Sequence, residues 1–332
     1  MSENKTQFLS VRDLSVIYTS GKKIVEAVNG ISFDLAKGET LALVGETGAG
    51  KTTIAKAILG ILPDPPAKLT GGQIFLEGKD LISASEEEML KVRGNKIAMI
   101  FQDPMTALNP LMTIGDQIVE GLLLHNDYTK EQAVARAGEM LELVGIPAAR
   151  YGEYPFEFSG GMKQRVVIAM ALACNPDLLL ADEPTTALDV TIQAQVLDLI
   201  RELRAKYNTA MLLITHDLGV VAETSDYVAV VYAGKIIEYG DKSAIFKHAA
   251  HPYTHGLFDS LPSMNVNSRR LKPINGSMPD PTQLPKGCAF APRCPYAQEA
   301  CRQGEIDMKE IAPGHFCRCL FEKQEDPLCP QA

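Results

Sequence analysis

The sequence predicts an α/β fold with a mixed central sheet, and two observations carry this prediction. Short, predominantly apolar segments at 40–44, 177–181 and 210–215 indicate buried strands, because strands covered on both faces lose the alternation of polar and apolar residues. Segments with helical periodicity, such as 192–207, separate these strands, and this alternation is typical of a sheet with parallel strands. The length of 332 residues suits one large domain with a small appendage, or two modest domains.

The sequence predicts the following strands and helices in order along the chain. Residues 9–18 and 27–35 predict an antiparallel strand pair joined through the turn at 21–23, and strand 40–44 runs into a glycine-rich loop. A helix should follow at 52–62 and end at Pro63. The later expected elements are a hairpin at 71–81, a strand at 96–101, a helical subdomain at about 103–175, a hairpin at 227–239, a helix near 243–260 and a linker at 262–285.

Bulk properties exclude some classes of protein. The formal net charge of −9 and pI near 5.3 argue against nucleic-acid binding through a broad basic surface. The N-terminus shows no secretory signal, and the longest apolar runs, at 166–174 and 227–233, are shorter than the roughly 20 residues that span a bilayer. We therefore expect a cytoplasmic protein whose association with a membrane depends on a partner.

The segment GETGAGKT at 45–52 fits the phosphate-loop pattern and stands between an expected strand and an expected helix. Glycines let the backbone wrap around phosphate oxygens, Lys51 reaches the β and γ phosphates, and Thr52 ligates magnesium. A plain glycine turn is the alternative, and the strand and helix on either side disfavour it. The expected nucleotide contacts here are Gly45, Thr47, Gly48, Ala49, Gly50, Lys51, Thr52 and Thr53.

A second acidic site follows the apolar strand 177–181. Asp182 is suited to orient magnesium, and Glu183 to polarise the attacking water. Without the phosphate loop, such a pair would more often be a helix cap or a solvated turn. No N-K-x-D motif for guanine is present, so ATP is the expected nucleotide.

Between these two motifs lies FSGGMKQR at 158–165, and with this order and spacing the chain resembles an ABC transporter ATPase over residues 7–260. The resemblance implies the fold of an ABC cassette, which is a phosphate-loop NTPase with an antiparallel β subdomain and a helical subdomain. It also implies that Ser159, Gly160 and Gly161 bind the nucleotide held by an opposite subunit. The ATPase domain should then occupy 1–260.

The resemblance assigns four further positions. Gln102 corresponds to the glutamine that contacts magnesium and water, and His216 to the switch histidine at the γ-phosphate. Asp189 resembles the residue that links the two sites of the dimer, although it could simply cap a helix. Tyr18 resembles the aromatic residue that stacks on adenine, with packing in the sheet as the alternative.

Six of the seven cysteines lie in the last part of the chain, and in a reducing compartment such a cluster predicts metal ligands. The segments HPYT at 251–254, PDP at 279–281 and GCAFAPRCP at 287–295 resemble the C-terminal extension of peptide importer subunits, which we expect here as a small irregular unit at 261–332. Cys288, Cys294, Cys301 and either Cys317 or Cys319 suit zinc or an iron-sulfur cluster. The family pattern implies a [4Fe-4S] cluster with Cys319 as the last ligand, and free cysteines remain the alternative.

Taken together, these features predict the ATP-hydrolysing subunit of an importer for dipeptides or oligopeptides. The resemblance implies two membrane-spanning permease subunits, a second ATPase subunit and an extracytoplasmic substrate-binding protein as partners, with no nucleic acid. The chain would then sit at the cytoplasmic face of the membrane. The alternatives are a soluble ABC-type ATPase, a motor for nickel or another small solute, and a metal-sensing module with a vestigial nucleotide site.

Overall fold

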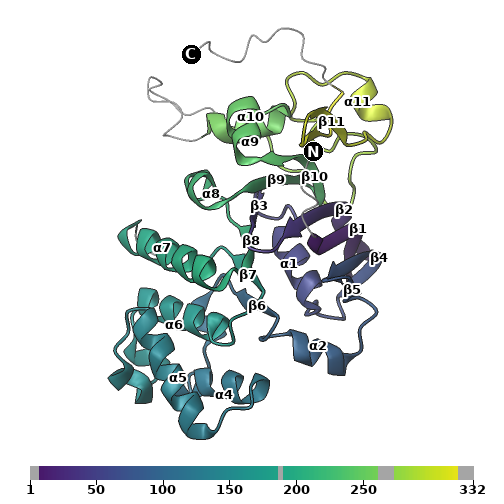
Figure 1. Cartoon of the computed structure of the whole chain (residues 1–332). Helices are drawn as coiled ribbons and strands as arrows, with labels where there is room; N and C mark the ends of the chain where they lie inside the picture. The colour runs from purple at the N-terminus through teal and green to yellow at the C-terminus, as the bar shows by residue number, and fades with distance from the viewer. Residues whose placement is uncertain (1–6, 186–189, 261–272, 321–332) are drawn as a thin grey trace.

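A computed structural model describes residues 7–185, 190–260 and 273–320 of the chain. Two β-sheets face each other across helix α1, and a group of helices lies at one end of the larger sheet (Figure 1). The strands are β1 (Gln7–Ser20), β2 (Lys23–Ala36), β3 (Thr40–Val44), β4 (Ala67–Leu76), β5 (Lys79–Asp80), β6 (Ile97–Ile100), β7 (Leu178–Asp182), β8 (Ala210–Ile214), β9 (Tyr227–Tyr232), β10 (Lys235–Asp241), β11 (Lys309–Ala312) and β12 (His315–Cys317).

The helices divide between the sheets and the helical subdomain. Those next to the sheets are α1 (Lys51–Leu59), α2 (Glu86–Val92), α7 (Val190–Tyr207), α8 (Leu218–Thr224), α9 (Lys242–His248), α10 (Pro252–Asp259) and α11 (Ala300–Gln303). The helical subdomain contains α3 (Pro104–Ala107), α4 (Ile114–His125), α5 (Lys130–Leu143), the 3-10 turns η1 (Ala148–Gly152) and η2 (Pro155–Glu157), and α6 (Gly160–Leu172).

The central sheet is mixed, as the sequence predicts. Its strand order is β11-β12-β10-β9-β3-β8-β7-β6, and the run from β9 to β6 is parallel. The remaining strands, β10, β12 and β11, are antiparallel to their neighbours. The carboxyl ends of the parallel strands therefore share one edge, where functional residues collect in such sheets.

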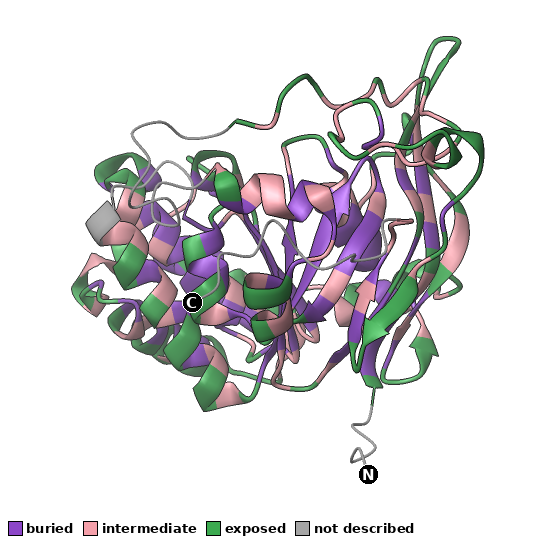
Figure 2. Cartoon of the chain, turned by 90° about the horizontal axis from the view of Figure 1, so that it is seen from above, coloured by how far each residue is buried: buried purple, intermediate pink, exposed green. Residues whose placement is uncertain are grey.

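The second sheet has the order β2-β1-β4-β5 and is antiparallel throughout, which confirms the predicted antiparallel β subdomain. Strands of the central sheet send alternate side chains to opposite faces. Leu41 and Leu43 of β3 join the core with α1 and this second sheet, whereas Ala42 and Val44 join a core with α8 and α10. In Figure 2 the buried strands accordingly lie inside the shell formed by helices and outer strands.

The helices differ from the prediction in three respects. Helix α1 ends at Leu59 because Gly60, with φ of 65°, takes the left-handed conformation that terminates helices. The single helix expected near 243–260 is two helices, since Pro252 lacks the N–H needed inside a helix and instead opens α10. The short helices α2 and α8 were not expected.

The C-terminal extension is less irregular than the sequence suggests. Strand β12 pairs with β10 through Glu238 and Tyr239, and β11 pairs with β12, so the extension continues the central sheet. The side chain of Phe290 is 2% exposed and packs in the same core as Tyr232 and Tyr253. Among the helices that the structure describes, none has the length and apolar character needed to cross a membrane.

Candidate functional site

The glycine-rich loop connects β3 to α1 at the carboxyl edge of the sheet. Gly45 and Gly50 are required by space: a Cβ at Gly45 would lie 2.1 Å from the Val231 carbonyl oxygen, and one at Gly50 would lie 2.3 Å from that of Ala27. Gly50 also has a φ of 101°, a value that side chains other than glycine rarely allow. The loop's backbone is therefore packed tightly against β2 and β9. Thr47 and Gly48 are exposed, whereas Ala49 is buried.

Lys51 is the first residue of α1, and its side chain is buried. The ammonium group donates hydrogen bonds to the carbonyl oxygens of Gly45 at 2.8 Å and Glu46 at 2.9 Å. Burial lowers the pKa of Lys51, and the carboxylates of Glu183 and Asp182 oppose this effect. The cation thus lies inside the loop and close to both acidic residues at the end of β7.

Asp182 and Thr52 meet between β7 and α1. The Thr52 hydroxyl donates to Asp182 Oδ1 at 3.1 Å, and Asp182 is 2% exposed. Burial raises the pKa of Asp182, and the hydrogen bond from Thr52 opposes that rise. Two of the three predicted magnesium contacts, Thr52 and Asp182, are therefore neighbours, and both present oxygen atoms, which magnesium prefers as ligands.

Glu183 is held between the other two predicted catalytic residues. Gln102, just after β6, donates from Nε2 to Glu183 Oε2 at 2.8 Å, and His216 Nδ1, just after β8, lies 3.3 Å from Glu183 Oε1. Glu183 has a φ of 46°, an unusual value for a residue with a side chain. Such conformations cost about 1–3 kcal/mol and cluster at functional sites. Three segments far apart in the chain thus converge on one carboxylate.

Tyr18 and Thr53 lie near the loop but contact each other. The Tyr18 hydroxyl and Thr53 Oγ1 are 3.3 Å apart, and the half-buried ring packs against the core between the two sheets. Tyr18 therefore packs against the sheet, as the alternative interpretation expects. Stacking of its ring on adenine stays a prediction.

The segment Ser159, Gly160 and Gly161 does not join this site. Ser159 caps α6 by accepting from the Met162 N–H, and it is exposed. Helix α6 packs in the core of the helical subdomain, whereas α1 packs on the opposite face of the central sheet. The segment stands apart from the phosphate loop of its own chain, as the predicted role toward an opposite subunit requires. Asp189 lies outside the described residues.

The described cysteines of the extension, Cys288, Cys294, Cys301, Cys317 and Cys319, lie close enough to influence one another's pKa, and Cys317 belongs to β12. The Cys288 N–H donates to the Cys301 carbonyl oxygen at 2.8 Å. Burial, and to a smaller extent the neighbouring thiols Cys288 and Cys301, raises the pKa of Cys294; burial likewise raises that of Cys317. Among the described residues, no three Cys, His, Asp or Glu side chains are arranged to hold a single metal ion.

The structure also reveals functional neighbours that the sequence does not indicate. Arg293 of the extension pairs with Glu46 of the phosphate loop at 2.9 Å. Glu238, which is 0% exposed, accepts from the N–H groups of Ala250 and His251 and from the Thr254 hydroxyl, and lies 2.8 Å from His315 Nε2. The sequence does not pair these residues with one another, although Glu46, His251, Thr254 and Arg293 belong to segments that carry the family resemblance.

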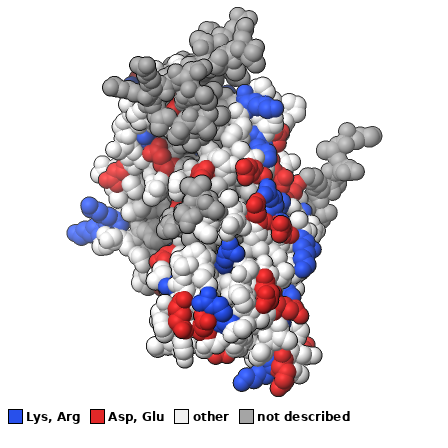
Figure 3. Space-filling model, turned by 90° about the vertical axis from the view of Figure 1, so that its left-hand side faces the viewer, with Lys and Arg blue, Asp and Glu red and all other residues white. Residues whose placement is uncertain are grey.

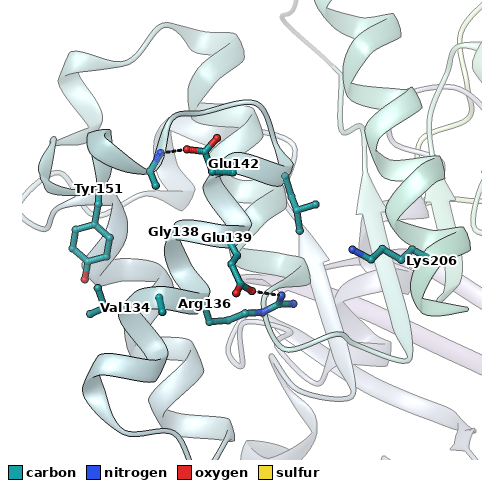
Figure 4. Close-up of a pocket in the computed structure, with 10 residues that line it drawn as sticks. Val134, Arg136, Gly138, Glu139, Glu142, Tyr151 and Lys206 are labelled. Atoms are coloured by element: carbon teal, nitrogen blue, oxygen red, sulfur yellow. Dashed lines mark hydrogen bonds and ion pairs between the residues drawn. The ribbon is translucent and has the colours of Figure 1, made fainter.

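A surface hollow of about 760 Å³ lies between the helical subdomain and the end of α7, away from the phosphate loop (Figure 4). Its lining includes Arg136, Glu139, Glu142, Tyr151 and Lys206, and Arg136 pairs with Glu139 along α5. None of the predicted nucleotide residues lines it. On the face shown in Figure 3, positive and negative side chains are interspersed among the described residues, unlike the basic stripe typical of nucleic-acid binders.

His251 gives a pH-dependent prediction. It caps α10, its Nδ1 accepts from the Tyr253 N–H at 3.0 Å, and burial lowers its pKa to about 4. Because the folded state disfavours protonation, the stabilisation is present above the unfolded pKa of about 6.5 and is lost as pH falls toward about 4. Between pH 7 and pH 5 this should cost about 2 kcal/mol of unfolding free energy.

His251→Asn should remove that loss while keeping a capping acceptor. Urea unfolding of both proteins at the two pH values checks this. If the two proteins lose the same stability on acidification, His251 is not the titrating group.

The fold and the site define the chain as a phosphate-loop nucleoside triphosphatase. A family model for ABC transporters matches residues 28–186, and one for the C-terminal region of oligopeptide/dipeptide transporters matches residues 237–301. The dipeptide transport ATP-binding protein DppD of Bacillus subtilis is 50% identical over 95% of this chain and 95% of its own. The oligopeptide transport ATP-binding protein OppD of the same organism is 51% identical over 97% of this chain and 91% of its own.

Solved structures agree with these relatives. The ATP-binding cassette MJ0796, in a dimeric post-hydrolysis state with ADP and Pi, has a TM-score of 0.64 and 26% identity, and the match covers 70% of this chain and 98% of that one. The chain belongs to the ABC transporter family, in the branch of the ATP-binding proteins of dipeptide and oligopeptide transport.

Proposed function

We propose that this chain binds and hydrolyses ATP to power the import of dipeptides or oligopeptides through a membrane ABC transporter. The observation that carries the proposal is the convergence of Gln102 and His216 on the Glu183 carboxylate, beside buried Lys51. This geometry is suited to activating one water molecule at the γ-phosphate end of a nucleotide. The peptide cargo follows from the two relatives named for dipeptide and oligopeptide transport.

Each residue of the site then has a chemical task. The loop amides and Lys51 bind the phosphates, and Thr52 with Asp182 supplies oxygen ligands for Mg²⁺, which is typically held by one or two carboxylates together with phosphates. Magnesium would neutralise charge on the phosphates. Glu183 orients and polarises the attacking water, while Gln102 and His216 fix the direction of its carboxylate. Tyr18 contacts the adenine ring.

Two cassettes act together in this proposal. Ser159, Gly160 and Gly161 at the start of α6, of which the first two are exposed, bind the nucleotide of an opposite ATPase subunit, and Asp189 links the two sites. The dimeric MJ0796 cassette supports this arrangement. We favour a heterodimer with a second ATPase chain, docked on two permease subunits at the cytoplasmic face and served by an extracytoplasmic binding protein.

Co-purification from detergent-solubilised membranes tests the proposal. A transporter subunit should be recovered with two membrane-spanning chains and a second, related ATPase. A soluble ABC-type ATPase would be recovered without membrane proteins, and that result would overturn the assignment.

We further propose that Cys288, Cys294, Cys301 and Cys319 hold a [4Fe-4S] cluster, with zinc as the alternative. A single zinc ion needs its ligands about 2.0–2.3 Å from one point, and the described thiols are not arranged in that way. In a cluster, each thiolate binds a different iron, so the ligands stand further apart. The pKa effects among Cys288, Cys294 and Cys301 support their proximity.

Anaerobic purification with metal analysis checks this prediction. We expect broad absorbance near 400 nm with about four irons and four sulfides per chain, lost in Cys294→Ser. Cys174→Ser is the matched control, because Cys174 lies in the helical subdomain, next to Asn126, and should leave the cluster intact. About one zinc, or no metal, would refute the cluster.

A further inference from the structure

A salt bridge connects the C-terminal extension to the phosphate loop. Arg293 Nη1 donates to both carboxylate oxygens of Glu46, at 2.9 and 3.0 Å. The Arg293 side chain is only 5% exposed and that of Glu46 is 30% exposed. The two residues are 247 positions apart in the chain, and Glu46 follows the first glycine of the loop. The contact therefore joins the nucleotide site to a separate part of the protein.

The guanidinium of Arg293 is held in a fixed position. Its Nε donates to the Asn275 carbonyl oxygen at 2.9 Å, and Nη2 donates to that of Ile274 at 3.3 Å. Nη1 also lies 3.3 Å from the Tyr232 hydroxyl. The group stands 5.9 Å from the ring centres of Tyr232 and Phe290. Because these hydrogen bonds fix the guanidinium, Arg293 presents a rigid donor to Glu46.

The backbone of Glu46 is tied down as well. Its N–H donates to the Tyr253 hydroxyl at 2.9 Å, and its carbonyl oxygen accepts from Lys51 at 2.9 Å. Tyr253 packs against Tyr232 and Phe290, with ring centres 4.6 and 5.4 Å apart. Figure 1 shows α10 and the yellow extension together above the central sheet. The first turn of the phosphate loop thus depends on contacts with α10 and the extension.

The charge of Glu46 gives this contact its importance. A carboxylate in a loop that binds a polyphosphate repels the ligand unless a cation neutralises it. Arg293 provides that positive charge at hydrogen-bonding distance from Glu46. Its other hydrogen bonds keep the guanidinium in this position. Met278 of the extension also lies against Gly48, because its Cε is 3.3 Å from the position of a Cβ there.

We propose that Arg293 is a positioning residue of the nucleotide site, which acts by neutralising the Glu46 carboxylate that would otherwise repel the phosphates. The C-terminal extension then contributes to the ATP site, and this role is separate from any binding of metal by its cysteines. The proposal rests on ATP being the ligand of the loop. It predicts that removing Arg293 weakens ATP binding, and that removing the charge of Glu46 as well restores most of it.

The test compares four full-length proteins: wild type, Arg293→Met, Glu46→Gln and the double variant. Binding of a fluorescent ATP analogue is measured for each, together with the thermal unfolding midpoint. Arg293→Met should weaken binding by about 5- to 150-fold, the usual range for coupling between two sites. Glu46→Gln alone should change affinity less than about threefold, and the double variant should bind within about threefold of it.

Arg318→Met is the matched control. Arg318 is another arginine of the extension, bonded to the carbonyl oxygens of Ile236 and Ile306, and it should leave ATP affinity unchanged. If Arg293→Met binds ATP like wild type, or if Glu46→Gln fails to rescue it, the proposal is wrong. The second result would mean that Arg293 only stabilises the extension. Failure of the wild-type protein itself to bind ATP would instead refute the proposed function.

Discussion

Replacing Glu183 with Gln is expected to slow ATP hydrolysis by about 100- to 10,000-fold while leaving ATP affinity within a few fold of wild type. The carboxylate stands between Gln102 and His216, so its loss removes the group that polarises water. A glutamine has nearly the same shape and keeps an acceptor for the Gln102 amide. Steady-state hydrolysis and equilibrium binding of an ATP analogue measure the two effects separately.

A matched control makes that result specific. Glu202→Gln removes the same charge from the exposed surface of α7 and should leave hydrolysis unchanged. If Glu183→Gln hydrolyses ATP at the wild-type rate, another group is the base. Lost ATP binding would show that Glu183 is needed to hold the nucleotide, which the proposed chemistry does not require.

Lys51→Met should weaken ATP binding by about 10- to 150-fold, with hydrolysis lost at ordinary ATP concentrations. Hydrogen bonds to charged groups contribute about 1.5–3 kcal/mol, which corresponds to that range of affinity. The free energy of unfolding should rise or stay nearly the same, because burial disfavours the charged form of Lys51 and lowers its pKa. Binding and urea unfolding of the same preparation separate these effects.

Lys37→Met provides the control for charge. Lys37 lies 2.7 Å from Asp177 on the surface, with a side chain that is 46% exposed, and its loss should not affect nucleotide binding. A Lys51→Met protein that binds ATP normally would contradict the phosphate-loop assignment. A Lys51→Met protein that loses stability as well as ATP binding would show that Lys51 mainly supports the fold.

Local patterns predicted most of the fold and the nucleotide residues. The apolar strand β3 has the predicted bounds, since five buried residues next to a glycine-rich loop leave little freedom. Phosphate binding requires particular residues in a short segment, so Lys51 and Thr52 can be found from spacing alone. The convergence of Gln102, Glu183 and His216 could be expected because each follows a strand of the same sheet.

The remaining features depend on tertiary packing. The continuation of the sheet by β12 and β11 could not be predicted, because these strands have three and four residues and a weak alternating pattern. The Arg293–Glu46 contact has no sequence signal, since its residues come from opposite ends of the chain. The early end of α1 depends on the left-handed conformation of Gly60, whereas the sequence pattern predicts an end at Pro63.

The most direct test of the central claim is ATP hydrolysis by the complete transporter in proteoliposomes, with and without peptide-loaded binding protein. We expect dipeptides or oligopeptides to stimulate hydrolysis and to accumulate inside vesicles oriented for import, with Glu183→Gln abolishing both. Nickel should do neither. Stimulation by nickel and not by peptides would assign a different cargo, and hydrolysis without any coupled uptake would contradict the account of this chain as an import motor.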